Sequence, residues 1–265
     1  MLRIARIIFG AAAVLFLLAP LAAILPMAFT SSVFLTYPIP DFSLRWFEEL
    51  FTAGAWRRSI INSLIVGFGT TVLATVLGTL AAVGLRGRFV LSGSVRTLFL
   101  LPMVVPAVVL GVGMQILFAR IGIASSYLGV IIAHTVLAVP FVLVSVTASL
   151  DGIDRSVERA ALSLGATPAS VLLRVTLPLA APGVISGAVL AFATSLDEVV
   201  LTLFVAGPNQ RTLARQMFST IRENISPAIA AAAFLFIAGT ILLALLVLLV
   251  RRRFKAPAPE TAAEA

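Results

Sequence analysis

The sequence predicts an all-helical integral membrane protein with six transmembrane helices and one helix-turn-helix loop between spans. Sixty per cent of the 265 residues are hydrophobic and only 11% are charged, and the mean hydropathy is +1.13. Soluble domains are roughly 45–50% apolar and about 25% charged, so an ordinary soluble fold is excluded. Six apolar runs each approach the roughly 20 residues that cross a 30 Å hydrocarbon core. A long polar-rich stretch, residues 151–178, separates two of these runs.

The six expected spans follow the apolar runs in order. They cover about residues 1–28, 60–83, 98–118, 128–150, 182–206 and 227–250. The first run follows Arg3 and Arg6 and is long enough to span, without a clear small-residue cleavage site, so we interpret it as a span and not a signal peptide. Residues 1–56 are then an N-terminal span and extracytoplasmic segment, 57–252 a transmembrane domain, and 253–265 a disordered cytosolic tail.

Two extramembrane helices are expected. The segment FSLRWFEEL, residues 42–50, is typical of a short surface helix with interfacial aromatic residues. Between Thr212 and Ile225, apolar residues recur every four positions among charged ones, which predicts an amphipathic helix at the membrane interface. These apolar residues are Leu213, Met217, Ile221 and Ile225.

Glycine and proline indicate how the spans pack and bend. The second span carries glycines that favour close helix packing in lipid, namely Gly67, Gly69, Gly78 and Gly84. The third span carries residues that predict a kinked or broken helix and serve as candidate hinges: Pro102, Pro106, Gly111 and Gly113.

The polar-rich stretch predicts two short helices joined by a tight turn. Asp154 or Ser156 can cap the first helix, and Gly165 is the expected left-handed stop. One apolar stripe on that helix is formed by Val157, Ala160, Ala161 and Leu164. Thr167 and Pro168 start the second helix, which we expect Pro178 to end. Because isolated helices shorter than about 12–15 residues are marginal in water, the stripe must pack on a partner or the membrane.

Basic residues predict the orientation. With both termini inside, twelve of the 19 Lys and Arg residues lie on the side of the hairpin, including Arg86, Arg88 and Arg96, and seven lie on the other side. This bias places the hairpin and both termini in the cytosol.

The composition also excludes several activities. There is no cysteine, the single histidine is His134, and the single lysine, Lys255, cannot complete a phosphate-binding loop, so no metal site and no ATPase site of that type is expected.

The hairpin resembles the cytoplasmic EAA loop of permeases in ATP-binding-cassette (ABC) importers. The matching residues are Ala160, Ala161, Gly165, Leu177 and Pro178. Arg159 stands where that family has a glutamate, and the acid lies one place earlier, at Glu158. From Ser195 onward the chain is similar to spermidine/putrescine-type permeases, with the pair Asp197–Glu198, then Gly207–Pro208 and Ile225–Ser226–Pro227. The resemblance covers about residues 59–252, but Ala107 replaces an acid common in polyamine-type members.

The resemblance implies a type I importer permease of the bacterial inner membrane, working by alternating access. It implies ABC ATPase subunits that bind ATP and Mg, a second homologous permease, and an extracytoplasmic solute-binding protein that docks around residues 212–225, with no cofactor and no nucleic acid on this chain. The residues expected to couple to the ATPase are Glu158, Arg159, Ala160, Ala161, Leu164 and Gly165. The candidates for the translocation path are Asp197, Glu198 and Gln115. Polyamine is the leading substrate, ahead of amino-acid derivatives, opine-like compounds and ferric iron.

Alternative interpretations remain open at this stage. The carboxylates of Asp197 and Glu198, about 22 Å along the fifth span from Pro182, suit either a cation path or an ion pair with Arg215 or Arg222. His134 suits a packing role in an apolar helix. Alternatively it could serve an intramembrane hydrolase with Ser145 or Ser186 as the nucleophile, although the sequence contains no nucleophile-elbow motif. An autonomous channel or hydrolase is the competing class, and the hairpin could also be a plain connector or, least of all, a DNA-binding motif.

Overall fold

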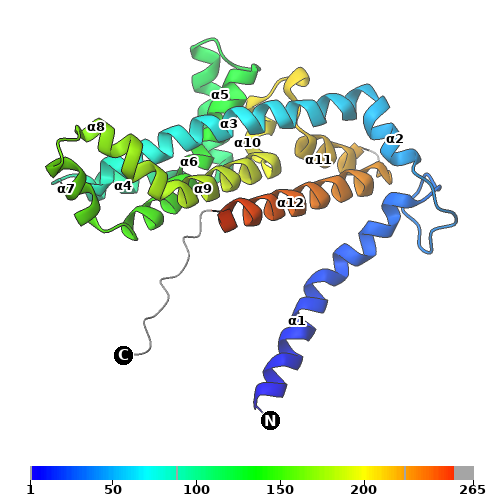
Figure 1. Cartoon of the computed structure of the whole chain (residues 1–265). Helices are drawn as coiled ribbons and strands as arrows, with labels where there is room; N and C mark the ends of the chain where they lie inside the picture. Colours follow the sequence, from blue (N-terminus) through cyan, green and yellow to red (C-terminus); the bar gives the residue numbers. More distant parts are fainter. Residues whose placement is uncertain (1, 88, 224, 254–265) are drawn as a thin grey trace. The chain divides into compact units, whose positions relative to one another are not determined.

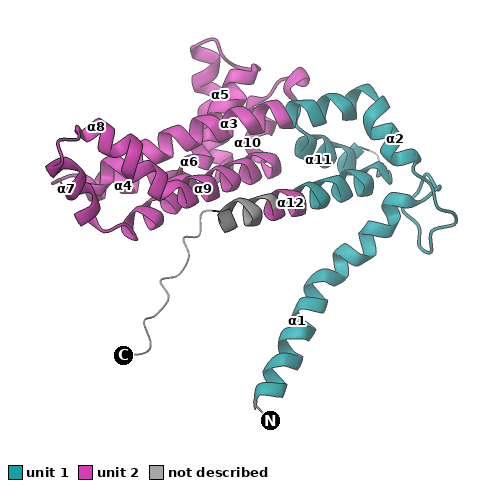
Figure 2. Ribbon diagram, viewed as in Figure 1, with its two compact units in different colours: residues 1–63, 211–239 teal, residues 64–210, 240–265 magenta. Residues whose placement is uncertain are grey.

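The computed structural model describes residues 2–87, 89–223 and 225–253, and within these ranges the chain is helical with no β-strand (Figure 1). The predictions for Arg88 and for the tail beyond residue 253 lie outside the described residues. The long helices are α1 (Leu2–Ile24), α3 (Gly54–Arg86), α6 (Tyr127–Asp151), α9 (Leu177–Asp197) and α12 (Ala228–Arg253). The chain divides into two compact units, residues 1–63 with 211–239 and residues 64–210 with 240–265 (Figure 2).

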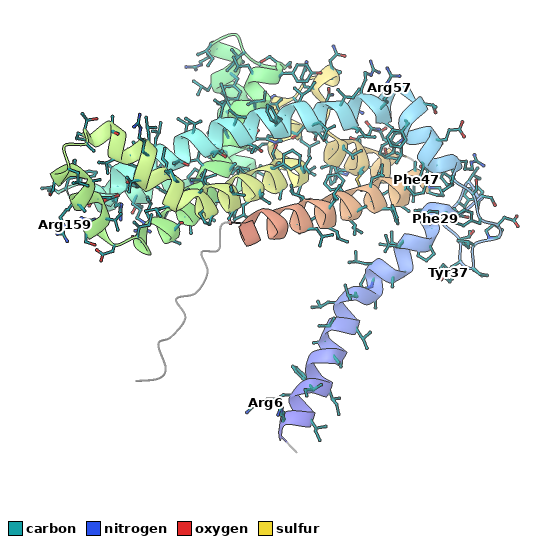
Figure 3. The ribbon with its side chains drawn as sticks, in the orientation of Figure 1. Arg6, Phe29, Tyr37, Phe47, Arg57 and Arg159 are labelled. Carbon is teal, nitrogen blue, oxygen red and sulfur yellow. The ribbon has the colours of Figure 1, made fainter. Side chains whose placement is uncertain are left out.

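The first unit has its own apolar core. Its short helices are α2 (Arg45–Thr52) and α11 (Leu213–Glu223), and their buried residues pack with the start of α12. Trp46 of α2 is buried, so the tryptophan expected at the membrane interface belongs to this core instead. Phe29 and Phe47 pack near it, with their rings tilted by 41° and ring centroids 5.1 Å apart (Figure 3). Helix α1 buries none of its apolar span inside the chain, which suits a lipid-facing helix.

The second unit is organised by close packing of α6 against α9 and α3. A Cβ added at Gly78 of α3 would lie 2.6 Å from Val142, and one added at Gly183 of α9 would lie 2.4 Å from the Cβ of Ser149. Gly67 and Gly69 are equally tight, as predicted, whereas Gly84 meets nothing within 4 Å and has no such role. These helices therefore approach to distances that only glycine permits.

Six spans are consistent with the structure. Among the described residues, five helices are long and apolar enough to cross a membrane, and there are six if a bent pair of helices counts as one span. The pair is α4 (Ser92–Leu100), continued by the 3₁₀ turn η2 (Leu101–Met103), and α5 (Ala107–Arg120), which meet at 98°. The prediction of a broken third span is thus confirmed, and the break lies between Met103 and Pro106, where proline removes a backbone donor and fixes φ.

The expectation that Pro178 ends the second hairpin helix is wrong. Helix α8 (Pro168–Val171) continues through a π-helical turn, η3 (Leu172–Thr176), into α9, so one helical run extends from Pro168 to Asp197. Proline lacks an N–H and clashes with the carbonyl four residues earlier in an ordinary α-helix. The wider π-helical turn directly before Pro178 relieves that conflict, so the hairpin joins the membrane helix without a break.

The fifth span is also shorter than expected. A single helix over residues 182–206 is predicted, but α9 ends at Asp197 and a separate short helix, α10 (Val200–Val205), follows. Glu198 is extended, with φ −76° and ψ 112°. Its carboxylate accepts the N–H of Leu201 at 2.7 Å, which caps the first turn of α10. The break thus lies at the acidic pair.

Candidate functional site

Local capping signals build the helical hairpin as the sequence predicts. Helix α7 (Arg155–Ser163) begins at Asp154, whose carboxylate accepts the N–H of Ser156 at 2.8 Å. This backbone hydrogen bond holds the pKa of Asp154 below its usual value. Gly165 adopts φ +87°, and the hydroxyl of Thr167 accepts the N–H of Ser170 at 3.3 Å to cap α8. The hairpin therefore consists of two capped helices, which a plain connector rarely needs.

The outer side of α7 is left open. No residue of α7 is buried, and Leu164, directly after it, is 88% exposed. Val157 and Leu162 are exposed as well, and Arg159 lies at the outer end of the hairpin (Figure 3). A nine-residue helix with a bare apolar side is too short to be stable by itself. This surface is available to another molecule.

The inner side of α7 is tied to α3 by a polar network. Arg86, the last residue of α3, forms an ion pair with Glu158 and donates to the carbonyls of Leu150 and Ile153 at 3.2 and 2.9 Å. The hydroxyl of Thr176 also donates to the Glu158 carboxylate, at 2.7 Å. Within the described residues this is the one ion pair that meets the 4 Å criterion, and it joins the ends of a span and the hairpin.

Sequence reasoning missed the partners in this network. Glu158, one of the residues expected to couple to the ATPase, forms an ion pair inside the chain with Arg86, and its coupling role stays a prediction. Arg155 adds a further bond, donating to the backbone carbonyl of Arg86 at 2.7 Å. Arginines follow the second span at 86, 88 and 96, and acids lie in the hairpin stretch at 151, 154 and 158. The sequence therefore offers several opposite charges and no local signal that pairs Arg86 with Glu158.

The acidic pair lies at the break in the fifth span. Asp197 is the last residue of α9 and is exposed, while Glu198 is half-buried and caps α10. The hydroxyl of Thr202 donates to the Glu198 carbonyl at 3.0 Å, which helps fix the extended segment. A helix break within a span frees backbone groups and presents carboxylates together, an arrangement that membrane proteins use where irregular backbone lines a cavity.

His134 packs across this break. It lies in α6, is 1% exposed, and its Nδ1 and Nε2 lie 2.9 Å from the hydroxyls of Ser195 and Thr202. Because the Thr202 proton goes to the Glu198 carbonyl, we infer that Nε2 carries the histidine proton and Ser195 donates to Nδ1. The predicted packing role is confirmed. The histidine fastens α9 and α10 to α6 on both sides of the acidic pair.

The hydrolase alternative has no geometric support. The hydroxyl of Ser145 donates to the Gly183 carbonyl at 3.0 Å and that of Ser186 donates to the Pro182 carbonyl at 2.7 Å, so neither reaches His134. The serine that does reach it, Ser195, is buried. Its hydroxyl is therefore closed off from an incoming substrate in this structure.

The remaining candidates lie on the broken third span. Gln115 is exposed on α5, Pro102 lies in η2 and Pro106 caps α5. Gly111 is buried, and a Cβ there would lie 2.6 Å from Phe204 of α10, while α5 runs without interruption through Gly113. The second halves of the two broken spans, α5 and α10, thus pack on each other. Among the described residues, no cluster of three His, Cys, Asp or Glu side chains could hold a metal ion.

The spans, the broken helices and the exposed hairpin define a polytopic membrane transport subunit. Residues 74–256 match the family described as the inner membrane component of binding-protein-dependent transport systems, and the chain belongs to that family. Its members are transport components of the inner membrane and not enzymes, so this chain is an integral inner-membrane permease subunit.

Relatives of known assignment transport different solutes. The putrescine transport system permease PotI of Escherichia coli K12 is 36% identical over 230 residues, 84% of this chain and 82% of PotI. The molybdenum transport system permease ModB of Mycobacterium bovis is also 36% identical, over 211 residues, 72% of this chain and 80% of ModB. A bacterial ABC transporter for alginate import has the same fold, with a TM-score of 0.73 at 17% identity, covering 96% of this chain and 94% of the other.

Proposed function

We propose that this chain is one permease half of an ABC importer that moves a small cationic, polyamine-like solute into the cytosol. Separate ATPase subunits, which hold ATP and Mg, supply the energy. The observation that carries the proposal is α7, whose apolar outer side is open and whose inner side is tied to a transmembrane helix. Membership of the binding-protein-dependent family supports it.

The hairpin is the proposed coupling element. Its outer surface, formed by Arg159, Ala160 and Leu164 with the turn at Gly165, docks in a groove of the ATPase. Ala161 is half-buried and supports this surface from behind. Glu158 acts inside the chain: because it is bonded to Arg86, a movement of α7 pulls on the end of α3. The continuous helix from Pro168 to Asp197 carries the same movement from the hairpin to the acidic pair.

The acidic pair is the proposed wall of the translocation path. A carboxylate inside a span costs about 2.5–3.5 kcal/mol by insertion scales, so its presence needs a function or a partner. Glu198 is held by Leu201 and by the break itself, whereas Asp197 is exposed and accessible to a passing cation. An ion pair with Arg215 or Arg222 stays the alternative. Gln115, exposed on α5, is a further candidate for the path.

Partners and orientation follow from the charge bias and the family. Both termini and the hairpin lie in the cytosol, and an extracytoplasmic solute-binding protein docks around α11. A second homologous permease completes the path, since six spans offer only half of it. The break at Pro102 and Pro106 supplies the flexing point of the third span, and Gly111 and Gly113 stay candidate hinges.

Solute uptake by cells that carry the complete importer tests the cationic substrate. Labelled putrescine should be taken up, and Asp197→Asn should reduce that uptake at least tenfold while ATPase association is unchanged. Asp41→Asn, the same change at an exposed acid in the segment before α2, is the matched control and should leave uptake intact. Uptake of molybdate but not of putrescine refutes the polyamine assignment, and molybdate is included because the relative ModB belongs to a molybdenum transport system. Equal putrescine uptake by Asp197→Asn and the unchanged chain refutes the role of Asp197 in the translocation path.

A further inference from the structure

A charged cavity lies beside the hairpin, at the end of the second unit where α4 begins. It has a volume of about 380 Å³, and its polar lining residues are Arg86, Ser92, Arg96, Thr147, Asp151 and Arg155. The helices that contribute are α3, α4, α6 and α7, and Figure 1 shows α4 and α7 at the same end of the bundle. Three guanidinium groups around one cavity favour an anion.

The charges in the cavity are not equally engaged. The Arg86 guanidinium is neutralised by Glu158, and Arg155 gives one N–H to a backbone carbonyl. Arg96 is exposed and forms no hydrogen bond or ion pair with the rest of the described chain. Asp151 is the single acid in the wall, so Arg96 and Arg155 leave a net positive charge. The N-terminus of α4 adds partial positive charge, since its N-cap, Leu91, provides no side-chain cap, although the Ser92 N–H is bonded to the Phe89 carbonyl at 3.0 Å.

An apolar groove runs along the same helices. Its volume is about 550 Å³, and it is lined by Leu73, Leu77 and Leu80 of α3, by Leu98 and Phe99 of α4, and by Val139 of α6. Ser92 to Arg96 of α4 line the cavity and Leu98 onward line the groove. Leu85 to Leu73 spans twelve residues, or about 18 Å at 1.5 Å per residue, close to the roughly 15 Å of one leaflet.

We propose that the cavity and groove together bind one anionic phospholipid of the cytoplasmic leaflet. The phosphate lies between Arg96 and Arg155 at the start of α4, and one acyl chain lies in the groove along α3. Charge complementarity favours this occupant, because the cytoplasmic leaflet is negatively charged and attracts basic side chains near its surface. The proposal rests on the proposed orientation of the hairpin, and not on the identity of the transported solute.

A bound lipid would connect the membrane to the hairpin. Arg155 belongs to α7 and donates to Arg86, so a phosphate held by Arg155 adds a contact to the network that ties the hairpin to α3. A free phosphate could satisfy the arginines but would leave the apolar groove unused. The two sources of the same phosphate chemistry are therefore separable by changing the groove.

Native mass spectrometry of the full-length chain in detergent tests the proposal. Phosphatidylglycerol is titrated against phosphatidylcholine with the same acyl chains, and inorganic phosphate is added in a separate series. We expect phosphatidylglycerol to bind in preference and Arg96→Gln to weaken it about fivefold, the effect of one basic residue near an anionic surface. Leu77→Trp, which fills the groove, should weaken it as well. Arg120→Gln, an exposed arginine at the far end of α5, is the matched control and should not.

Three results would overturn the lipid assignment. Equal binding by Arg96→Gln and Arg120→Gln shows that the cavity does not hold the headgroup. Competition by inorganic phosphate, with no effect of Leu77→Trp, shows a site for a free anion. Unchanged lipid binding combined with loss of ATPase association in Arg96→Gln shows that the cavity belongs to the ATPase interface. None of these results depends on solute uptake, so failure here is distinct from failure of the proposed transport function.

Discussion

Replacing Arg86 with alanine should release the hairpin from the transmembrane bundle. The Arg86 side chain is 12% exposed and that of Glu158 is 22% exposed, so the pair is largely withdrawn from water. The substitution removes the ion pair and both bonds to the carbonyls of Leu150 and Ile153. It also leaves the Glu158 carboxylate with the hydroxyl of Thr176 as its remaining hydrogen-bond donor among those described.

The size of the effect follows from the same contacts. Removing one partner of a fully buried pair costs about 3–5 kcal/mol, and the partial exposure of Glu158 reduces this figure. Hydrogen bonds to charged groups contribute about 1.5–3 kcal/mol each, although water can replace part of them at this end of the bundle. We therefore expect the free energy of local opening of α7 to fall by about 3 kcal/mol. This corresponds to an increase of roughly a hundredfold in the equilibrium constant for opening.

Hydrogen exchange of α7 amides in lipid nanodiscs measures this opening. Arg86→Ala should accelerate exchange in residues 155–163 by about a hundredfold, while α6 keeps its rate. Arg159→Ala removes an exposed arginine from the same helix and is the matched control. A double-mutant cycle with Glu158→Gln should give a coupling energy above about 1 kcal/mol. Unchanged exchange in Arg86→Ala, or a coupling energy near zero, refutes the tie between α7 and α3.

Three further predictions concern packing, the helix break and the cap. Gly183→Val should destabilise the detergent-solubilised chain by about 1–3 kcal/mol and so lower its melting temperature, because the new Cβ would lie 2.4 Å from a serine of α6. Gly84→Val is the control and should leave the melting temperature unchanged, because a Cβ there meets nothing within 4 Å. His134→Phe should cost about 2 kcal/mol in the same assay by leaving two buried hydroxyls without the imidazole, and a gain in stability would contradict the assigned clamp. Asp154 has a lowered folded-state pKa, so its cap stabilises α7 above the unfolded value of about 3.9 and is lost as pH falls through the lower folded value. Asp154→Asn should remove this pH dependence from the protection factors of the α7 amides, measured relative to intrinsic exchange at each pH.

The features of the fold that the sequence predicts correctly depend on residues close together in the chain. Asp154, Gly165 and Thr167 act through neighbours one to three residues away, so their roles can be read from spacing alone. The prolines at 102 and 106 likewise announce the broken third span. The glycines of the second span also act locally, since a residue without a side chain lets another helix approach closely wherever the two cross.

The remaining features depend on contacts between distant positions or on compensation. Arg86 meets Glu158 across 72 residues, a pairing that no periodicity reveals. Pro178 is a strong helix terminator by local rules, and the π-helical turn before it reverses that expectation. No proline or glycine lies at the break after Asp197, so the usual signals for a helix end are missing there. The Glu198 side chain instead accepts the Leu201 N–H and caps the next helix. The apolar groove is lined by residues of α3, α4 and α6 that lie far apart in the sequence, so no local pattern predicts it.

The most direct test of the central claim is co-purification of the ATPase with a hairpin variant. Leu164→Glu places a charge on a side chain that is 88% exposed, so the chain itself should fold normally. Val90→Glu, at a fully exposed valine outside the hairpin, is the matched control. We predict that the unchanged chain and Val90→Glu bring down the ATPase and that Leu164→Glu does not. Retention of the ATPase by Leu164→Glu, or its absence from all three, would contradict the assignment of α7 as the coupling element.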